Sequence, residues 1–494
     1  MSPAPWQAQE HPCQVLTGSF PGTWWRPDHP DSRVAGVLTL DYDGISLELI
    51  GSFGTVEDMG RVRAYEFLHG VTTGGLLVTL MGCHVTNETL IMSAIGLRST
   101  RLQPGAALIG DHVNDPQGAS WRTCRIELER MTAWASPLGF ERSLELTDSG
   151  HLKGASFRYE IPQSVVSRLP GATLSIRPRA TTSGDLIHET RIAVEVEASF
   201  ELDQPANLEE INQEFLKPLL NLVILATQKP TSIVKFCVAA AAGPPNRLVE
   251  VVMRRPAPAS EDPRRLHSKN ALFLLPDLLE ASANGVALWY AAAAEVQRAF
   301  DLVFAVRNTP RLFLDHRFLN AATAAESYHE ARFDRHTMPK KVWDTIVKAA
   351  LGAAGTTELA DQIQGRMAML NKPSLRDRIE ELIKRGGEPL RGLLPDPDGL
   401  ASRAARLRND LAHGSSATAR NLELFDATDE LLLVLEFHFL REAGFSAEGA
   451  ADRLKAASSS YSGLWLRRGE ASRVRTPAEN PGPEEISSEG SSTE

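Results

Sequence analysis

The sequence predicts an α+β protein in which a β-rich N-terminal part, of sandwich or barrel type, precedes an all-α helical bundle. From Val34 onward, short apolar and β-branched runs alternate with Gly, Asp and Asn turn signals, which is typical of strands. In the C-terminal part, apolar residues recur at spacings of three and four, which is typical of helices. A stretch rich in Pro and charge separates the two patterns, as expected of a linker.

The N-terminal part contains the strand-like runs Val34–Leu40, Ile45–Leu49, Leu76–Met81, Arg125–Glu129 and Ile192–Val196. Asp43-Gly44, between the first two runs, favours a tight hairpin. A helix is expected at about 207–227, followed by strands at 233–239 and 248–253. We assign residues 14–253 to one β-rich domain.

The linker is predicted at 254–265 and the helical domain at 266–460. The domain contains the helical runs 272–306, 311–332, 341–351, 357–370, 375–385, 399–413 and 422–443. Residues 472–494 lose apolar content and collect Pro, Ser and Glu, which predicts a disordered acidic tail.

Composition excludes several function classes. A net charge of -10 argues against a protein that binds nucleic acid through a strongly basic surface. No apolar run approaches the ~18 residues that a membrane-spanning helix needs. The N-terminus lacks the pattern of a secretory leader, and the four cysteines form no CxxC pair, so we expect a cytoplasmic protein with reduced thiols.

Motif searches narrow the chemistry further. The sequence contains no HExxH, no phosphate-binding GxxxxGK[ST], no GxGxxG that opens a helix and no GxSxG. Metalloprotease, P-loop ATPase and serine hydrolase functions are therefore not expected. We predict neither a metal nor a cofactor.

Arg408 and His413 form an R-x4-H pair, in which a cation and a titratable imidazole can meet one phosphate. Chance alone predicts about one such pair in a chain of this composition. A second pair, Arg311 and His316, occurs in the same sequence. It follows Pro310 at a helix entrance rich in bulky apolar residues, so we interpret that pair as structural.

The sequence around Arg408 and His413 favours a catalytic role for this pair. Residues 402–413 predict a helix that ends at Gly414, a typical helix-terminating position. His413 then lies in the last turn, where the helix dipole favours a protonated imidazole. Asn409 is four residues before His413 and shares its helix face. The long Arg408 side chain can swing round the helix to the same anion.

Three blocks in the helical part carry a family resemblance: RNDLAHG at 408–414, NKPSL at 371–375, and FLNA with ESYH at 318–329. They resemble the ApeA-type HEPN domain. GTWW at 22–25, VAGVL at 34–38 and LELIG at 47–51 resemble the N-terminal domain that accompanies it in ApeA anti-phage proteins.

The resemblance implies a metal-independent endoribonuclease that acts as a dimer or higher homo-oligomer on RNA, such as the loops of tRNA. It implies that His413 is the acid or base, that Arg408 clamps the phosphate and that Asn409 orients His413 or the phosphate. Glu326 matches a polar position of the family and is a candidate for substrate binding, with a solvated helix face as the alternative. The N-terminal domain would sense infection through an unknown phage-derived trigger.

Three alternatives stay open. The HEPN domain could be an inactive dimerisation or nucleotide-binding module. It could be the toxin of a two-gene system whose partner modifies a Tyr two residues after the His, although Ser415 occupies that position here. The chain could also be a β-domain ligand-binding protein with a helical appendage, in which Trp24, Trp25 and Trp121 form ligand platforms.

Overall fold

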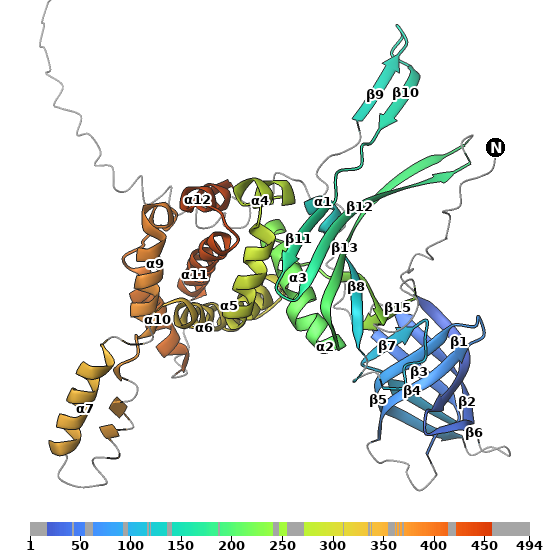
Figure 1. Ribbon diagram of the computed structural model, residues 1–494, viewed down its shortest axis with the longest axis horizontal. Helices are drawn as coiled ribbons and strands as arrows, with labels where there is room; N and C mark the ends of the chain where they lie inside the picture. The colour runs from blue at the N-terminus through green and yellow to red at the C-terminus, as the bar shows by residue number, and fades with distance from the viewer. Residues whose placement is uncertain are drawn as a thin grey trace, which may run out of the picture.

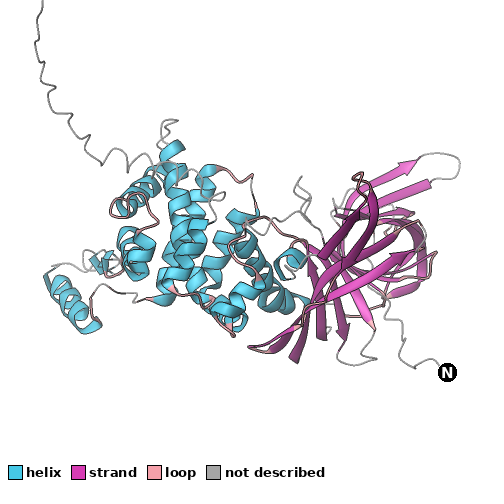
Figure 2. Cartoon of the chain, turned by 90° about the horizontal axis from the view of Figure 1, so that it is seen from above, coloured by secondary structure: helices cyan, strands magenta, loops and turns pink. Residues whose placement is uncertain are grey.

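The computed structural model describes most of the chain between residues 17 and 456. The described residues are 17–41, 44–54, 63–91, 97–115, 118, 120–135, 141–185, 188–240, 247–253, 271–309, 311–333, 336, 338–353, 361, 363–364, 366–367, 370–412 and 421–456. Strands gather at one end of the molecule and helices at the other (Figures 1 and 2). The predicted linker at 254–265 and the tail at 472–494 lie outside the described residues.

The N-terminal β-structure is a closed barrel, which decides between the two predicted architectures. Its six strands are β1 (Gly18–Arg26), β2 (His29–Asp41), β3 (Gly44–Ile50), β4 (Ala64–Thr72), β5 (Leu77–Ile91) and β6 (Leu97–Gln103). They pair in the order β5-β4-β1-β2-β3-β6, and pairing of β5 with β6 closes the ring. The expected strands at 34–40, 45–49 and 76–81 are confirmed within β2, β3 and β5.

Strand β5 belongs to both the barrel and a second, open sheet. Its first half, Val78 to Met81, pairs with β7 (Ala106–Ile109), whereas the half that begins at His84 pairs with β6. Between the halves, Gly82 adopts a φ of 57°, which L side chains rarely tolerate. This bend lets one strand serve both sheets.

The open sheet continues in the order β7-β15-β14-β8-β13-β12-β11. Its further strands are β8 (Trp121–Leu128), β11 (Val165–Leu169), β12 (Ala172–Gly184), β13 (Thr190–Ala206), β14 (Ile233–Ala240) and β15 (Leu248–Met253). A separate hairpin of β9 (Glu141–Leu146) and β10 (Leu152–Arg158) projects from the body (Figure 1). Cys83 and Cys124 are free thiols, but Cys237 is disulfide-bonded, so the expectation of reduced thiols is wrong for that residue.

The helix expected at 207–227 is present but interrupted by a π-helical turn. It comprises α2 (Leu208–Ile211), η2 (Asn212–Leu216) and α3 (Lys217–Thr227). A reciprocal capping box between Asn207 and Glu210 starts it, and Gln228 in the left-handed conformation ends it. A short α1 (Met131–Ala135) follows β8.

The helical part contains α4 (Leu275–Ala281), α5 (Gly285–Asn308), α6 (Leu314–Arg332), α7 (Lys340–Ala353), α9 (Leu375–Arg391), α10 (Leu400–Ala412), α11 (Asn421–Glu442) and α12 (Ala447–Ala456). The helix expected at 272–306 is in fact two. Ser282 and Asn284 lie at the break, and both residue types favour turns and caps over helix interiors. None of the helices in the described ranges is both long and apolar enough to cross a bilayer.

The hydrophobic interior consists of two separate cores of different size. One core fills the barrel around the buried ring of Trp24. The other extends from the open sheet through α3 and α5 to α11. Trp289 Nε1 donates to the Pro218 carbonyl at 2.8 Å, and the Tyr290 hydroxyl donates to the Phe215 carbonyl at 2.7 Å, so α5 is fixed to the helices of the N-terminal part.

Candidate active site

Helix α10 carries Arg408 and Asn409, two of the predicted site residues, and is held on one face by packing. Leu400, Ala404 and Leu407 are buried at helical spacing. This face meets α6, α9 and α11. Asp396 supports the start of the helix, because its Oδ1 accepts from the Gly399 amide at 3.1 Å. The helix expected at 399–413 is therefore confirmed over its described length.

Arg408 and Asn409 are exposed on α10. Neither side chain has a hydrogen-bond or ion-pair partner in the part of the chain that the structure describes. The other two arginines of this helix differ. Arg403 contacts Asp396 and Glu430, and Arg406 contacts Glu423 and Asp410. Arg408 is thus the arginine of α10 whose guanidinium is available to an external anion.

His413 lies outside the described residues, as does Gly414. The convergence of Arg408 and His413 on one phosphate therefore stays a prediction from the sequence.

Glu326 lies half-buried on α6, a helix that contacts α10. Its backbone carbonyl accepts from Arg378 Nη1 at 2.8 Å, which ties α6 to α9. Its carboxylate has no partner among the described residues. The structure thus places Glu326 and Arg408 on neighbouring helices.

The second R-x4-H pair lies at the start of α6. The predicted helix entrance is confirmed, since α6 begins at Leu314 and both Leu312 and Leu314 pack against the core. Arg311 and His316 are nevertheless exposed, and Phe313 is 79% exposed, so inward packing does not extend to these three side chains. This pair offers a matched control for Arg408 and His413.

The sequence reasoning missed the residues that hold α10 and α11 in place. Arg403 Nη2 lies 3.0 and 2.8 Å from the two carboxylate oxygens of Glu430. Burial, the largest effect, raises the pKa of Glu430 to about 7, although Arg403 opposes the shift. Glu436, fully buried, accepts from Arg307 Nε at 2.6 Å and from Gln228 Nε2 at 3.1 Å. Glu430 immediately before the apolar run 431–440 and Glu436 inside it were the available signal.

A buried histidine near the candidate site has a structural role. His329 Nε2 lies 2.9 Å from Glu381 Oε2, and the ring is covered by Phe333. The hydrogen bond with His329 is the main reason why the pKa of Glu381 is lowered. Because His329 is 1% exposed, it joins α6 to α9 and does not reach a substrate.

Two further expectations concern ligands. Across the described ranges, His, Cys, Asp and Glu side chains form no group of three that could hold a metal ion. Trp24, Trp25 and Trp121 are buried, and Trp24 lies in the barrel core. They are core residues, so the interpretation of these residues as ligand platforms is wrong.

Two family models match the chain. The model of ApeA N-terminal domain 1 matches residues 19–278, and the Apea-like HEPN model matches residues 319–449, which include Glu326, Arg408, Asn409 and His413. The chain matches no curated protein and no solved structure.

A β-barrel region followed by a HEPN helical domain defines an effector of the anti-phage HEPN type, and HEPN domains generally act on RNA and dimerise. More specifically, the chain belongs to the ApeA family, because the first model alone spans more than half of its length.

Proposed function

We propose that this protein is a metal-independent endoribonuclease of anti-phage abortive infection, with Arg408 and His413 at its active site. The observation that carries the proposal is the guanidinium of Arg408, which has no partner among the described residues, on a helix whose other arginines are occupied by carboxylates. An exposed guanidinium presents a planar fork of donors that matches the oxygens of a phosphate.

The reaction is an attack by a ribose 2′-oxygen on the adjacent phosphorus. The new O–P bond forms as the bond to the 5′-oxygen breaks, which leaves a 2′,3′-cyclic phosphate and a 5′-hydroxyl. His413 accepts the 2′-hydroxyl proton, and the second histidine of a homodimer returns a proton to the leaving oxygen. Arg408 stabilises the charge of the phosphorane, Asn409 orients the imidazole or the phosphate, and Glu326 contacts the substrate.

Cleavage through the 2′-hydroxyl restricts the substrate to RNA. Single-stranded loops, such as those of tRNA, let the reacting groups line up, whereas a duplex holds them apart. The moderate net charge fits an enzyme that grips one phosphate locally instead of binding RNA along its length. The enzyme acts in the cytoplasm, where this substrate occurs.

Residues 14–253 act as the sensor of infection and residues 266–460 as the effector, joined by the linker at 254–265. The contacts of Trp289 and Tyr290 with the N-terminal helices offer a direct mechanical route between the two parts. A phage-derived trigger that binds the N-terminal part activates the nuclease, because a constantly active enzyme would poison its own cell.

The test compares Arg408→Ala and His413→Ala with the matched pair Arg311→Ala and His316→Ala. Each full-length variant is expressed in cells challenged with phage, and purified protein is incubated with RNA in EDTA. We expect wild type and the matched pair to protect the cells and to leave 2′,3′-cyclic phosphate ends. The Arg408 and His413 variants should do neither.

Full cleavage by His413→Ala would overturn the catalytic assignment. Absence of cleavage in every variant and in infected cells, with an intact dimer, would instead support a catalytically inactive HEPN module.

A further inference from the structure

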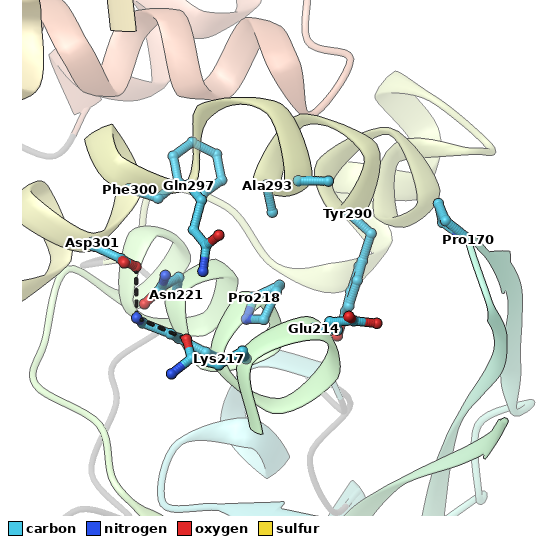
Figure 3. Close-up of a pocket in the computed structure, with 12 residues that line it drawn as sticks. Pro170, Glu214, Lys217, Pro218, Asn221, Tyr290, Ala293, Gln297, Phe300 and Asp301 are labelled. Carbon is cyan, nitrogen blue, oxygen red and sulfur yellow. Dashed lines mark hydrogen bonds and ion pairs between the residues drawn. The ribbon is translucent and has the colours of Figure 1, made fainter. Parts of the chain in front are cut away.

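A cavity of about 610 Å³ lies where the N-terminal helices meet the helical part. Its walls come from η2 and α3 on one side and from α5 on the other, and Pro170, in the β11–β12 turn, lies at one edge (Figure 3). This volume is within the range of small-molecule sites, which concentrate at junctions between structural units. The cavity is remote in sequence from Arg408 and belongs to no site described above.

Both helical walls depart from regular geometry at this cavity. Gln213 and Glu214 project from the π-helical turn η2, and π turns occur often at functional sites. On the opposite wall, α5 has a non-helical residue at Val296, next to the lining residue Gln297. Irregular turns, which are frequent at functional sites, therefore flank the cavity on both sides.

Asn221 provides an independent sign of a ligand. It lies in the middle of α3, is only 6% exposed and lines the cavity. Within the described residues its carboxamide has no hydrogen-bond partner, and Figure 3 shows it beside the ion pair of Lys217 with Asp301. Its carboxamide faces the cavity without a partner in that part of the chain, so a bound molecule that offers a donor and an acceptor could pair with it.

The charges of the lining define what such a molecule can be. Lys217 Nζ lies 2.8 Å from Asp301 Oδ1 and donates to Gln213 Oε1 at 3.3 Å, so its charge is already neutralised. Glu214 leaves the cavity with an excess negative charge, which disfavours phosphates and other anions. The ligand must therefore be uncharged or cationic.

The remaining lining narrows the ligand class. Asn221 and Gln297 supply carboxamides, which pair with the donor and acceptor edge of a nucleobase, whereas the carboxamide of Gln213 is already bonded to Glu209 and Lys217. Phe300, Ala293 and Pro218 supply apolar surface for a flat ring. Phe300 stacks on Trp289, with centroids 4.4 Å apart, and contacts Phe439 of α11. A flat ring bound here would thus touch both parts of the protein.

We infer that this cavity, centred on the unpartnered carboxamide of Asn221, binds an uncharged nucleobase or nucleoside at the junction of the two parts. The inference requires no nuclease activity, so it stands or falls separately from the proposed function.

The experiment uses the full chain with adenosine, guanosine, cytidine and uridine, each compared with its 5′-monophosphate. Isothermal titration calorimetry and the shift in melting temperature report binding. We expect at least one nucleoside to bind and its monophosphate to bind about tenfold more weakly, because the added charge meets the excess negative charge of Glu214.

Asn221→Ala should weaken nucleoside binding by about tenfold or more. Gln297→Ala, at the exposed rim, should weaken it to a smaller degree and serves as the second variant if Asn221→Ala does not fold. Asn114→Ala, at an exposed site outside the lining, is the matched control and should bind as wild type does.

Three results would overturn the inference. One is the absence of heat and of any melting shift with every nucleoside at about 1 mM. Another is binding that both Asn221→Ala and Gln297→Ala leave unchanged. The third is tighter binding of the monophosphates, which would indicate an anion site.

Discussion

Arg403 of α10 grips the carboxylate of Glu430 on α11, with its Nη2 3.0 and 2.8 Å from the two oxygens. The Arg403 Nη1 atom also lies 2.8 Å from Asp396 Oδ2, at the start of α10. The guanidinium therefore locks α10 at a point five residues before Arg408. Because the side chain of Glu430 is only 4% exposed, this ion pair also places a carboxylate where ionisation is costly.

The free energy of unfolding should depend on pH through the ionisation of Glu430. The pKa of Glu430 rises from 4.5 to about 7 on folding, so the folded state holds a proton more tightly than the unfolded state. Its contribution to the free energy of unfolding is therefore largest below pH 4.5. This contribution, about 3 kcal/mol, is lost as the pH rises to about 7. Glu430→Gln should gain that amount relative to wild type between these pH values.

Chemical denaturation at several pH values measures this difference. Glu423→Gln, which removes the more exposed partner of Arg406, is the matched control. A constant difference between Glu430→Gln and wild type across this range would contradict the prediction.

His438 should have the opposite effect on the pH dependence of stability, because it destabilises the folded protein at low pH. It is buried on α11, its Nε2–H donates to the Leu382 carbonyl at 3.0 Å, and burial lowers the pKa of His438 from 6.5 to about 4. The folded state thus disfavours protonation of His438. The free energy of unfolding should therefore fall by about 3 kcal/mol as the pH is lowered from 6.5 through 4. His438→Gln keeps a donor and should remove this acid-side loss in the same denaturation series. An unchanged acid slope would refute the assignment.

The barrel should be sensitive to a single methyl group at Gly70. A Cβ there would lie 2.1 Å from the buried ring of Trp24, so Gly70→Ala should cost about 3 kcal/mol. Gly74→Ala, whose Cβ would meet only Thr72 Oγ1 at 3.8 Å, is the control and should be nearly neutral. Differential scanning calorimetry of both variants tests this, and equal melting profiles would show that the ring can move aside.

The two hydrophobic cores should unfold in separate transitions. Trp289→Ala removes a fully buried ring from the core shared by the open sheet and the helices. It should lower the free energy of unfolding of that core alone, by about 4 kcal/mol. Gly70→Ala should lower only the barrel transition. Trp343→Ala, on α7, where no residue is buried, is the control. One transition that both Gly70→Ala and Trp289→Ala lower equally would show a single cooperative unit.

Arg408 should require its guanidinium and not only its charge. If Arg408 clamps two phosphate oxygens, Arg408→Lys should retain the cation but lose the bidentate geometry, with RNA cleavage reduced roughly 10- to 100-fold. Arg311→Lys should cleave as wild type does. Cleavage by Arg408→Lys at the wild-type rate would show that a point charge suffices.

The sequence alone determined the class of each half of the fold. Alternation along 34–40 and 45–49 predicted strands, and spacing along 399–413 and 422–443 predicted helices, because these periodicities are local properties of the chain. It also singled out Arg408, Asn409, His413 and Glu326, since residue type and spacing are visible without coordinates.

Only the tertiary structure decided how the parts combine. Closure of the barrel depends on the pairing of β5 with β6, and the shared core depends on packing of α3 against α5. It likewise showed that carboxylates occupy Arg403 and Arg406 whereas Arg408 has no partner in the described part of the chain, and that Asn221 faces a cavity. Such contacts join residues far apart in sequence, so their energies depend on the complete fold and leave no local periodicity to read.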